Sequence, residues 1–201
     1  MNYLEGNVCI FGDSIVWGWG SSEFGGWTHK LLAYAHNVVA GENIVYSLGM
    51  PGETTEGLLK RIKSESYART PNTIIIASGL NDCRYNKVSD KRAVEVEEFK
   101  KNIAEIIKIA REFTKKIVFI GLTKVNEKHT IPIIWNADEM YKNEDIKKYN
   151  DELQQICIRE EIKFIDVIDL LNIDDIDAID GLHPNIRGHE KMFKHIKEQL
   201  I

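Results

Sequence analysis

Five short runs of apolar residues, separated by longer stretches with helical spacing, constrain the fold of this chain more than any other feature. Within each run the apolar residues are mostly continuous and do not alternate with polar ones. Continuous runs are typical of strands that are covered on both faces, as in a parallel sheet. The runs lie at residues 8–11, 44–46, 73–77, 117–120 and 164–167.

Apolar residues between these runs recur every three or four positions, which predicts amphipathic helices. Three clear stripes cover residues 96–110, 146–156 and 192–200, and shorter patterns fall near 27–39 and 54–66. Strand and helix thus alternate five times along the chain. This order predicts an α/β fold: a flavodoxin-like, three-layer α/β/α sandwich around a doubly wound, five-stranded parallel sheet with right-handed crossovers.

The chain shows no internal repeat, no low-complexity segment and no linker-like stretch, so residues 1–201 are predicted to form a single domain. The longest irregular stretch is Lys124–Asn143, after the fourth strand. Loops of this length are often functional. We expect this one to act as a lid over a binding site or as a subunit contact, with Trp135 as a possible cleft residue.

Polar residues follow the predicted strands, where parallel α/β sheets bind their ligands. Ser14 follows the first strand, Gly49 the second and Asn81 the third, while Asp180 and His183 lie beyond the fifth. We expect these residues to meet at one edge of the sheet.

This set contains the parts that acyl transfer requires. A serine hydroxyl is a weak nucleophile until a base such as imidazole takes its proton. A carboxylate on the other ring nitrogen holds the imidazole in one tautomer. The oxyanion of the tetrahedral intermediate needs preorganised donors. The backbone N–H groups of Ser14 and Gly49 and the side-chain amide of Asn81 are suitable donors.

Three short segments resemble the blocks of the SGNH hydrolases, also called the GDSL esterases and lipases: residues 12–15, 79–82 and 180–183. Ile15 stands where the family usually has Leu. The resemblance implies the SGNH hydrolase fold, with Ser14 as nucleophile, His183 as general base and Asp180 orienting it. It also implies an oxyanion hole formed by Ser14, Gly49 and Asn81.

The second family block matches less well. Ser47 occupies the position where the family often has Asn, two residues before its glycine, and both Gly49 and Gly52 remain in this segment. Gly49 is the expected oxyanion donor.

The predicted function is hydrolysis of a carboxylic ester or thioester through an acyl-serine intermediate. The resemblance leaves acetylated sugars, lysophospholipids and small acyl esters open as substrates. The G-x-S-x-G nucleophile elbow of another hydrolase fold is absent. The alternative is a non-catalytic module, either flavodoxin-like or carbohydrate-binding. The sequence has no G-x-G-x-x-G or P-loop pattern, which argues against a flavodoxin-like module that binds nucleotides.

Other residues receive structural or open interpretations. Trp17 and Trp19, flanked by glycines, could wall the substrate cleft. Asp13 and Asp82 are interpreted as structural, and His189 is expected on the surface. No spacing typical of a metal site occurs, so no metal and no cofactor are predicted.

Composition limits the possible partners. The net charge of −5 and the lack of a Lys/Arg block argue against nucleic-acid binding. No apolar stretch approaches the ~20 residues of a membrane span, and no signal-peptide pattern occurs. The three cysteines include no C-x-x-C pair, which favours free thiols and a cytoplasmic location. The expected partner is a small ester, and the oligomeric state stays open.

Overall fold

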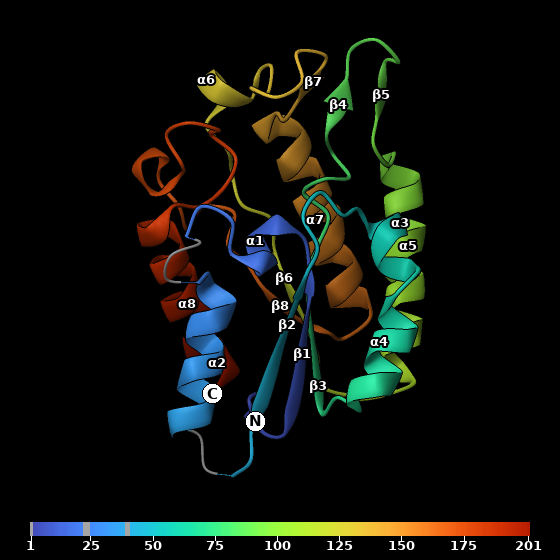
Figure 1. The fold of residues 1–201 in the computed structure, drawn as a ribbon. Helices are drawn as coiled ribbons and strands as arrows, with labels where there is room; N and C mark the ends of the chain where they lie inside the picture. The colour runs from blue at the N-terminus through green and yellow to red at the C-terminus, as the bar shows by residue number, and fades with distance from the viewer. Residues whose placement is uncertain (1, 22–24, 39–40) are drawn as a thin grey trace.

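A five-stranded parallel sheet forms the centre of the molecule in the computed structural model, which describes residues 2–21, 25–38 and 41–201 (Figure 1). Its strands are β1 (Asn7–Gly12), β2 (Ile44–Gly49), β3 (Thr73–Ala77), β6 (Ile117–Ile120) and β8 (Lys163–Ile165). Their order is β2-β1-β3-β6-β8, and every neighbouring pair is parallel. The predicted α/β class and parallel sheet are confirmed.

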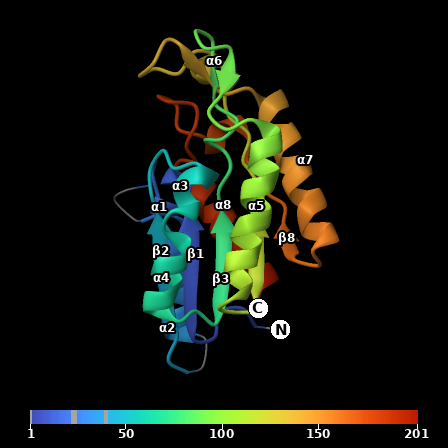
Figure 2. The same ribbon diagram turned by 90° about the vertical axis from the view of Figure 1, so that its right-hand side faces the viewer.

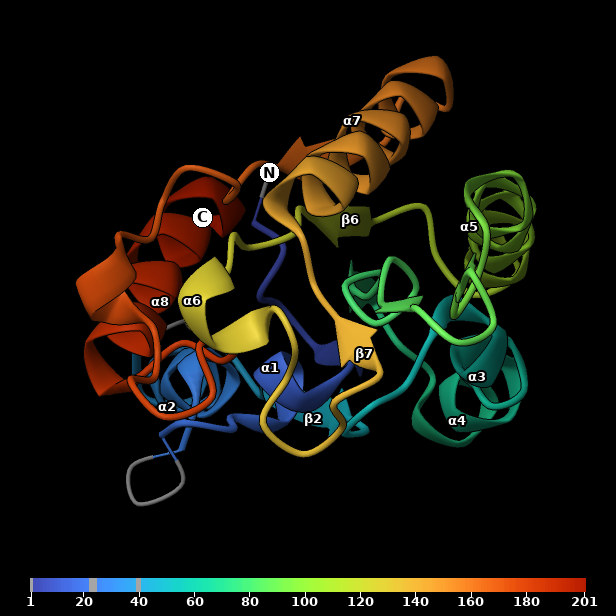
Figure 3. The same cartoon turned by 90° about the horizontal axis from the view of Figure 1, so that it is seen from above.

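Helices cover both faces of this sheet. α2 (Trp27–Val38) and α8 (Ile186–Leu200) pack together on one face. Figure 3 shows four further helices on the opposite face: α3 (Thr55–Leu59), α4 (Ile62–Arg69), α5 (Val96–Arg111) and α7 (Asn143–Arg159). The pattern near 54–66 is therefore two helices. They separate at Arg61, whose Nε donates to the Glu53 carboxylate at 2.7 Å.

Burial explains the continuous apolar runs. Residues 8–12 of β1, 73–76 of β3 and all of β6 are buried, since helices cover them on both sides. Strand β2 lies at the sheet edge and leaves Ile44 half exposed. Strand β8, at the other edge, ends at Ile165, earlier than the predicted 167. The chain turns there because the Asp166 carboxylate accepts a hydrogen bond from the Ile168 N–H at 3.1 Å.

A second, antiparallel sheet rises above the carboxyl edge of the first (Figure 2). It consists of β4 (Tyr85–Asn86), β5 (Lys91–Arg92) and β7 (Glu139–Met140), in the order β5-β4-β7. The predicted irregular stretch 124–143 therefore contains β7 and the short helix α6 (Glu127–Thr130). Strands of two residues are too short to show a period, which is why the sequence pattern missed this sheet.

Among the described residues, no helix is both long and apolar enough to cross a membrane. The three cysteines are free and buried: Cys9, Cys83 and Cys157.

Candidate active site

Ser14 is placed by the end of β1, an inner strand of the parallel sheet. It is the first residue of α1 (Ser14–Trp17). Asp13 caps this helix, since its carboxylate accepts a hydrogen bond from the Ile15 N–H at 2.9 Å. Burial raises the pKa of Asp13 to about 6. The Asp13 side chain thus caps a helix, in agreement with the structural role that the sequence suggested.

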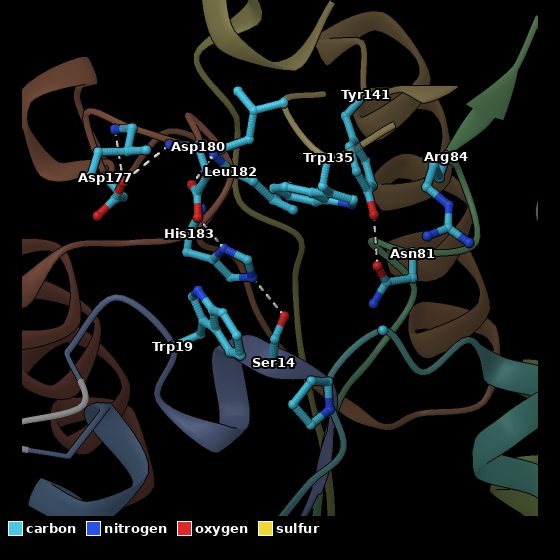
Figure 4. A pocket seen from close by; sticks show the side chains of 14 residues that line it. Ser14, Trp19, Asn81, Arg84, Trp135, Tyr141, Asp177, Asp180, Leu182 and His183 are labelled. Atoms are coloured by element: carbon cyan, nitrogen blue, oxygen red, sulfur yellow. Dashed lines mark hydrogen bonds and ion pairs between the residues drawn. The ribbon is translucent and has the colours of Figure 1, made fainter. Parts of the chain in front are cut away.

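A chain of hydrogen bonds joins Ser14, His183 and Asp180 (Figure 4). Ser14 Oγ lies 2.8 Å from His183 Nε2, and His183 Nδ1 lies 2.7 Å from Asp180 Oδ2. An ionised carboxylate can only accept, so Nδ1 carries the proton in the neutral ring. Nε2 is then an acceptor, and the serine hydroxyl donates to it. This is the tautomer that a general base requires.

The Asp180 carboxylate is held in its ionised form. Burial acts to raise its pKa, but hydrogen bonds from the His183 ring and from backbone N–H groups outweigh burial and hold the pKa below its ordinary value. These backbone donors are Leu182 at 2.8 Å and His183 at 3.0 Å, both to Asp180 Oδ1. Asp177 fixes the preceding turn by accepting from the Asp180 N–H at 3.1 Å.

Asn81 lies across the cleft from His183, in the turn that follows β3 (Figure 4). Its Nδ2 donates to the Glu53 carbonyl at 3.1 Å, and its Oδ1 accepts from the Tyr141 hydroxyl at 2.7 Å. Asp82 beside it is fully buried and accepts from the Thr55 N–H at 3.0 Å. Burial raises the pKa of Asp82 to about 7.

The two glycines of the second block occupy different places. Gly49 lies against α1, where a Cβ would stand 2.2 Å from the Trp17 backbone nitrogen, and it does not line the cleft. Gly52 lines the cleft with a φ of +77°, and a Cβ there would meet nothing within 4 Å. Within the described ranges, neither the Gly52 N–H nor the Ser14 N–H has a hydrogen-bond acceptor.

The cleft beside Ser14 has a volume of about 630 Å³, within the usual range for small-molecule sites. Of the three tryptophans considered, Trp19 and Trp135 line it, whereas Trp17 does not. The centroid of the Trp17 ring lies 5.6 Å from that of the Trp19 ring. Sequence reasoning did not single out several further lining residues: Pro51, Arg84, Tyr141, Asp177, Ile179 and Leu182.

His189 is fully buried, so its expected surface position is wrong. The Trp27 N–H points at its Nδ1 at 3.3 Å, which makes Nδ1 an acceptor, and Nε2 donates to the Trp19 carbonyl at 2.8 Å. Burial lowers the pKa of His189 to about 4. A neutral His189 thus holds the backbone of Trp19, whose ring lies 5.6 Å from the His183 ring. The sequence could not predict this burial, because the helical spacing of α8 shows only that His189 lies near the apolar face of the helix.

Within residues 2–21, 25–38 and 41–201, no group of three or more His, Cys, Asp and Glu side chains is arranged to hold a metal ion.

Fold and cleft together define an α/β enzyme of the SGNH hydrolase type. The profile of the GDSL-like lipase/acylhydrolase family matches residues 10–191. The chain belongs to this family and is a hydrolase acting on ester bonds, not the non-catalytic module considered as the alternative.

Solved structures similar to this chain share its fold along almost the whole length. A lipase/acylhydrolase from Enterococcus faecalis is 22% identical with a TM-score of 0.75, covering 97% of this chain and 95% of that one. A catalytic mutant of an acetylxylan esterase from Geobacillus stearothermophilus is 17% identical with a TM-score of 0.75, covering 98% and 94%. No curated protein matches the chain significantly.

Proposed function

We propose that this enzyme cleaves a carboxylic ester or thioester through an acyl intermediate on Ser14. The single observation that carries the proposal is the hydrogen-bonded chain from Ser14 Oγ through His183 to Asp180, with both links under 3 Å, at the wall of an open cleft.

In the first half-reaction, Ser14 Oγ attacks the carbonyl carbon while its proton passes to His183 Nε2. The resulting imidazolium is stabilised by the Asp180 carboxylate. Collapse of the tetrahedral intermediate breaks the bond to the leaving oxygen or sulfur, which takes the proton from His183. The acyl group stays on Ser14 as an ester.

In the second half-reaction, water attacks the acyl carbon and gives one proton to His183. The new tetrahedral intermediate expels Ser14 Oγ, which recovers that proton, and the acid leaves. No metal or cofactor takes part in this scheme.

The oxyanion that forms in each half-reaction needs donors fixed in advance. We assign this role to the Ser14 N–H, the Asn81 Nδ2 and the Gly52 N–H. Gly52 replaces Gly49 because Gly49 packs against α1, whereas Gly52 lines the cleft and its N–H has no acceptor among the described residues. Gly49 instead allows β2 to approach α1 closely.

For the substrate, we propose a small acyl ester or an acetylated sugar. The volume of the cleft and the Trp19 and Trp135 rings in its lining support a compact ligand with an apolar face. The structurally similar acetylxylan esterase supports the sugar alternative. A panel of p-nitrophenyl esters of increasing chain length, acetylated xylosides and a lysophospholipid separates these classes, and the class with the highest kcat/KM identifies the substrate.

A fluorophosphonate probe tests the nucleophile directly. We expect it to label the wild-type protein at Ser14 and to inactivate ester hydrolysis in proportion to labelling. Labelling should be absent in Ser14→Ala. Labelling of Ser14→Ala at the wild-type rate, or hydrolysis unaffected by complete labelling, would show that Ser14 is not the nucleophile.

A further inference from the structure

Tyr141 is a buried residue of the cleft wall that the reaction scheme above does not use. It directly follows β7, about 60 residues after Asn81 in sequence, and only 1% of its surface is exposed. Figure 4 shows its hydroxyl pointing at the Asn81 side chain, at the wall opposite His183. The distance from the Tyr141 hydroxyl oxygen to Asn81 Oδ1 is 2.7 Å.

The direction of this hydrogen bond follows from the other partner of Asn81. The Glu53 backbone carbonyl can only accept, so the amide atom 3.1 Å from it must be the NH₂ group. The other amide atom is then the oxygen, and the Tyr141 hydroxyl must donate to it. Two contacts thus fix the amide plane and leave one N–H of Asn81 for the cleft.

The small antiparallel sheet connects the two residues. Strand β4 begins four residues after Asn81 and pairs with β7, in the register Tyr85↔Met140 and Asn86↔Glu139. Arg84 adds an ion pair to Glu139 at 3.4 Å. Because Met140 precedes Tyr141, this pairing sets the height of the tyrosine above the Asn81 turn.

The backbone of Tyr141 is also held from its other side. Its N–H donates to the Thr130 carbonyl at 3.0 Å, and its carbonyl accepts from the Thr130 hydroxyl at 2.9 Å. Burial raises the pKa of Tyr141 well above its ordinary value, so its hydroxyl keeps its proton throughout the neutral range.

We propose that Tyr141 is a positioning residue for the oxyanion site: it orients and polarises the Asn81 amide, and the small sheet holds it there. The inference rests on the proposed role of Asn81. A hydrogen bond to the amide oxygen withdraws electron density from the nitrogen and strengthens its remaining N–H as a donor. The segment 124–143 thereby contributes to the chemical step as well as covering the cleft.

A double-mutant cycle tests this inference. In Tyr141→Phe we expect kcat for a p-nitrophenyl ester to fall about tenfold, with KM changed less than twofold. In the Asn81→Ala background the same substitution should lower kcat less than twofold further, because a residue that acts through Asn81 has no effect once Asn81 is gone.

Tyr149→Phe is the matched control. Tyr149 is equally buried, and its hydroxyl donates to the Val94 carbonyl at 2.6 Å, outside the lining of the cleft. This variant should keep kcat within twofold of wild type. Thermal unfolding of both variants shows how much stability each loses.

The outcomes separate the two proposals. Full activity in Asn81→Ala overturns the oxyanion role of Asn81 and the positioning role of Tyr141 with it. Loss of activity in Asn81→Ala but not in Tyr141→Phe overturns only the positioning role. If the two substitutions lower kcat independently, so that their effects multiply in the double mutant, Tyr141 acts only through general stability. The same conclusion follows if Tyr149→Phe lowers kcat as much as Tyr141→Phe does.

Discussion

The two walls of the cleft are built in different ways. On one wall, Asp180 and His183 lie three residues apart on one short segment, and His183 links Asp180 to Ser14. On the other, Asn81 is held by Glu53 and Tyr141, which come from segments 28 and 60 residues away. In the proposed mechanism, the first wall moves protons and the second supplies fixed donors. Proton transfer needs particular side chains, whereas a donor can come from any well-placed N–H.

The largest expected effect concerns the first wall. Asp180→Asn removes the charge that holds His183 in its tautomer, and kcat/KM should fall by about 10⁴. Steady-state hydrolysis of a p-nitrophenyl ester measures this. Asp174→Asn, an exposed site on the preceding turn, is the control and should keep wild-type activity. A loss below tenfold in Asp180→Asn would mean that another group orients His183.

On the second wall, Asn81→Ala removes one oxyanion donor. We expect kcat to fall by about 10²–10³, with a small change in KM, because the donor matters most in the transition state. Fluorophosphonate labelling should slow in parallel, since the phosphonyl oxygen occupies the same site. A fall confined to KM would assign Asn81 to substrate binding instead.

The two glycines offer a comparison within one segment. Gly49→Ala places a methyl group 2.2 Å from the Trp17 backbone nitrogen, so we expect it to lower the free energy of unfolding by about 3 kcal/mol. Gly52→Ala meets no neighbour and should cost about 1 kcal/mol for its positive φ. Urea unfolding compares them. Equal losses would contradict the different environments described for these glycines.

A further effect concerns pH and stability. The pKa of His189 is about 4 in the folded protein against an ordinary value of 6.5, so the unfolded chain binds the proton more tightly. The stability that neutral His189 contributes is complete above pH 6.5 and is lost as the pH falls towards 4. Wild type should therefore lose ~3 kcal/mol relative to His189→Gln over this range.

Urea unfolding at several pH values measures this difference, with the exposed His36→Gln as control. His36→Gln should follow the wild-type curve throughout. Parallel curves for wild type and His189→Gln would show that His189 titrates normally.

The parallel sheet could be predicted because its apolar runs are local and nearly continuous. Ser14, Asn81, Asp180 and His183 could be located because they stand in short segments at strand ends, where parallel topology brings ligand-binding residues together. The choice between Gly49 and Gly52 could not be made from sequence, since they are glycines three residues apart and only their neighbours in the fold distinguish them.

By itself, the sequence determined the class of fold and the residues whose chemistry is rare enough to be recognised in a short segment. Tertiary structure alone decided the burial of His189, the small sheet, and the contact of Tyr141 with Asn81. These features depend on contacts between segments far apart in the chain. A tyrosine or histidine looks the same in sequence whether its hydrogen-bond partner is water or a buried amide, and only packing removes the water.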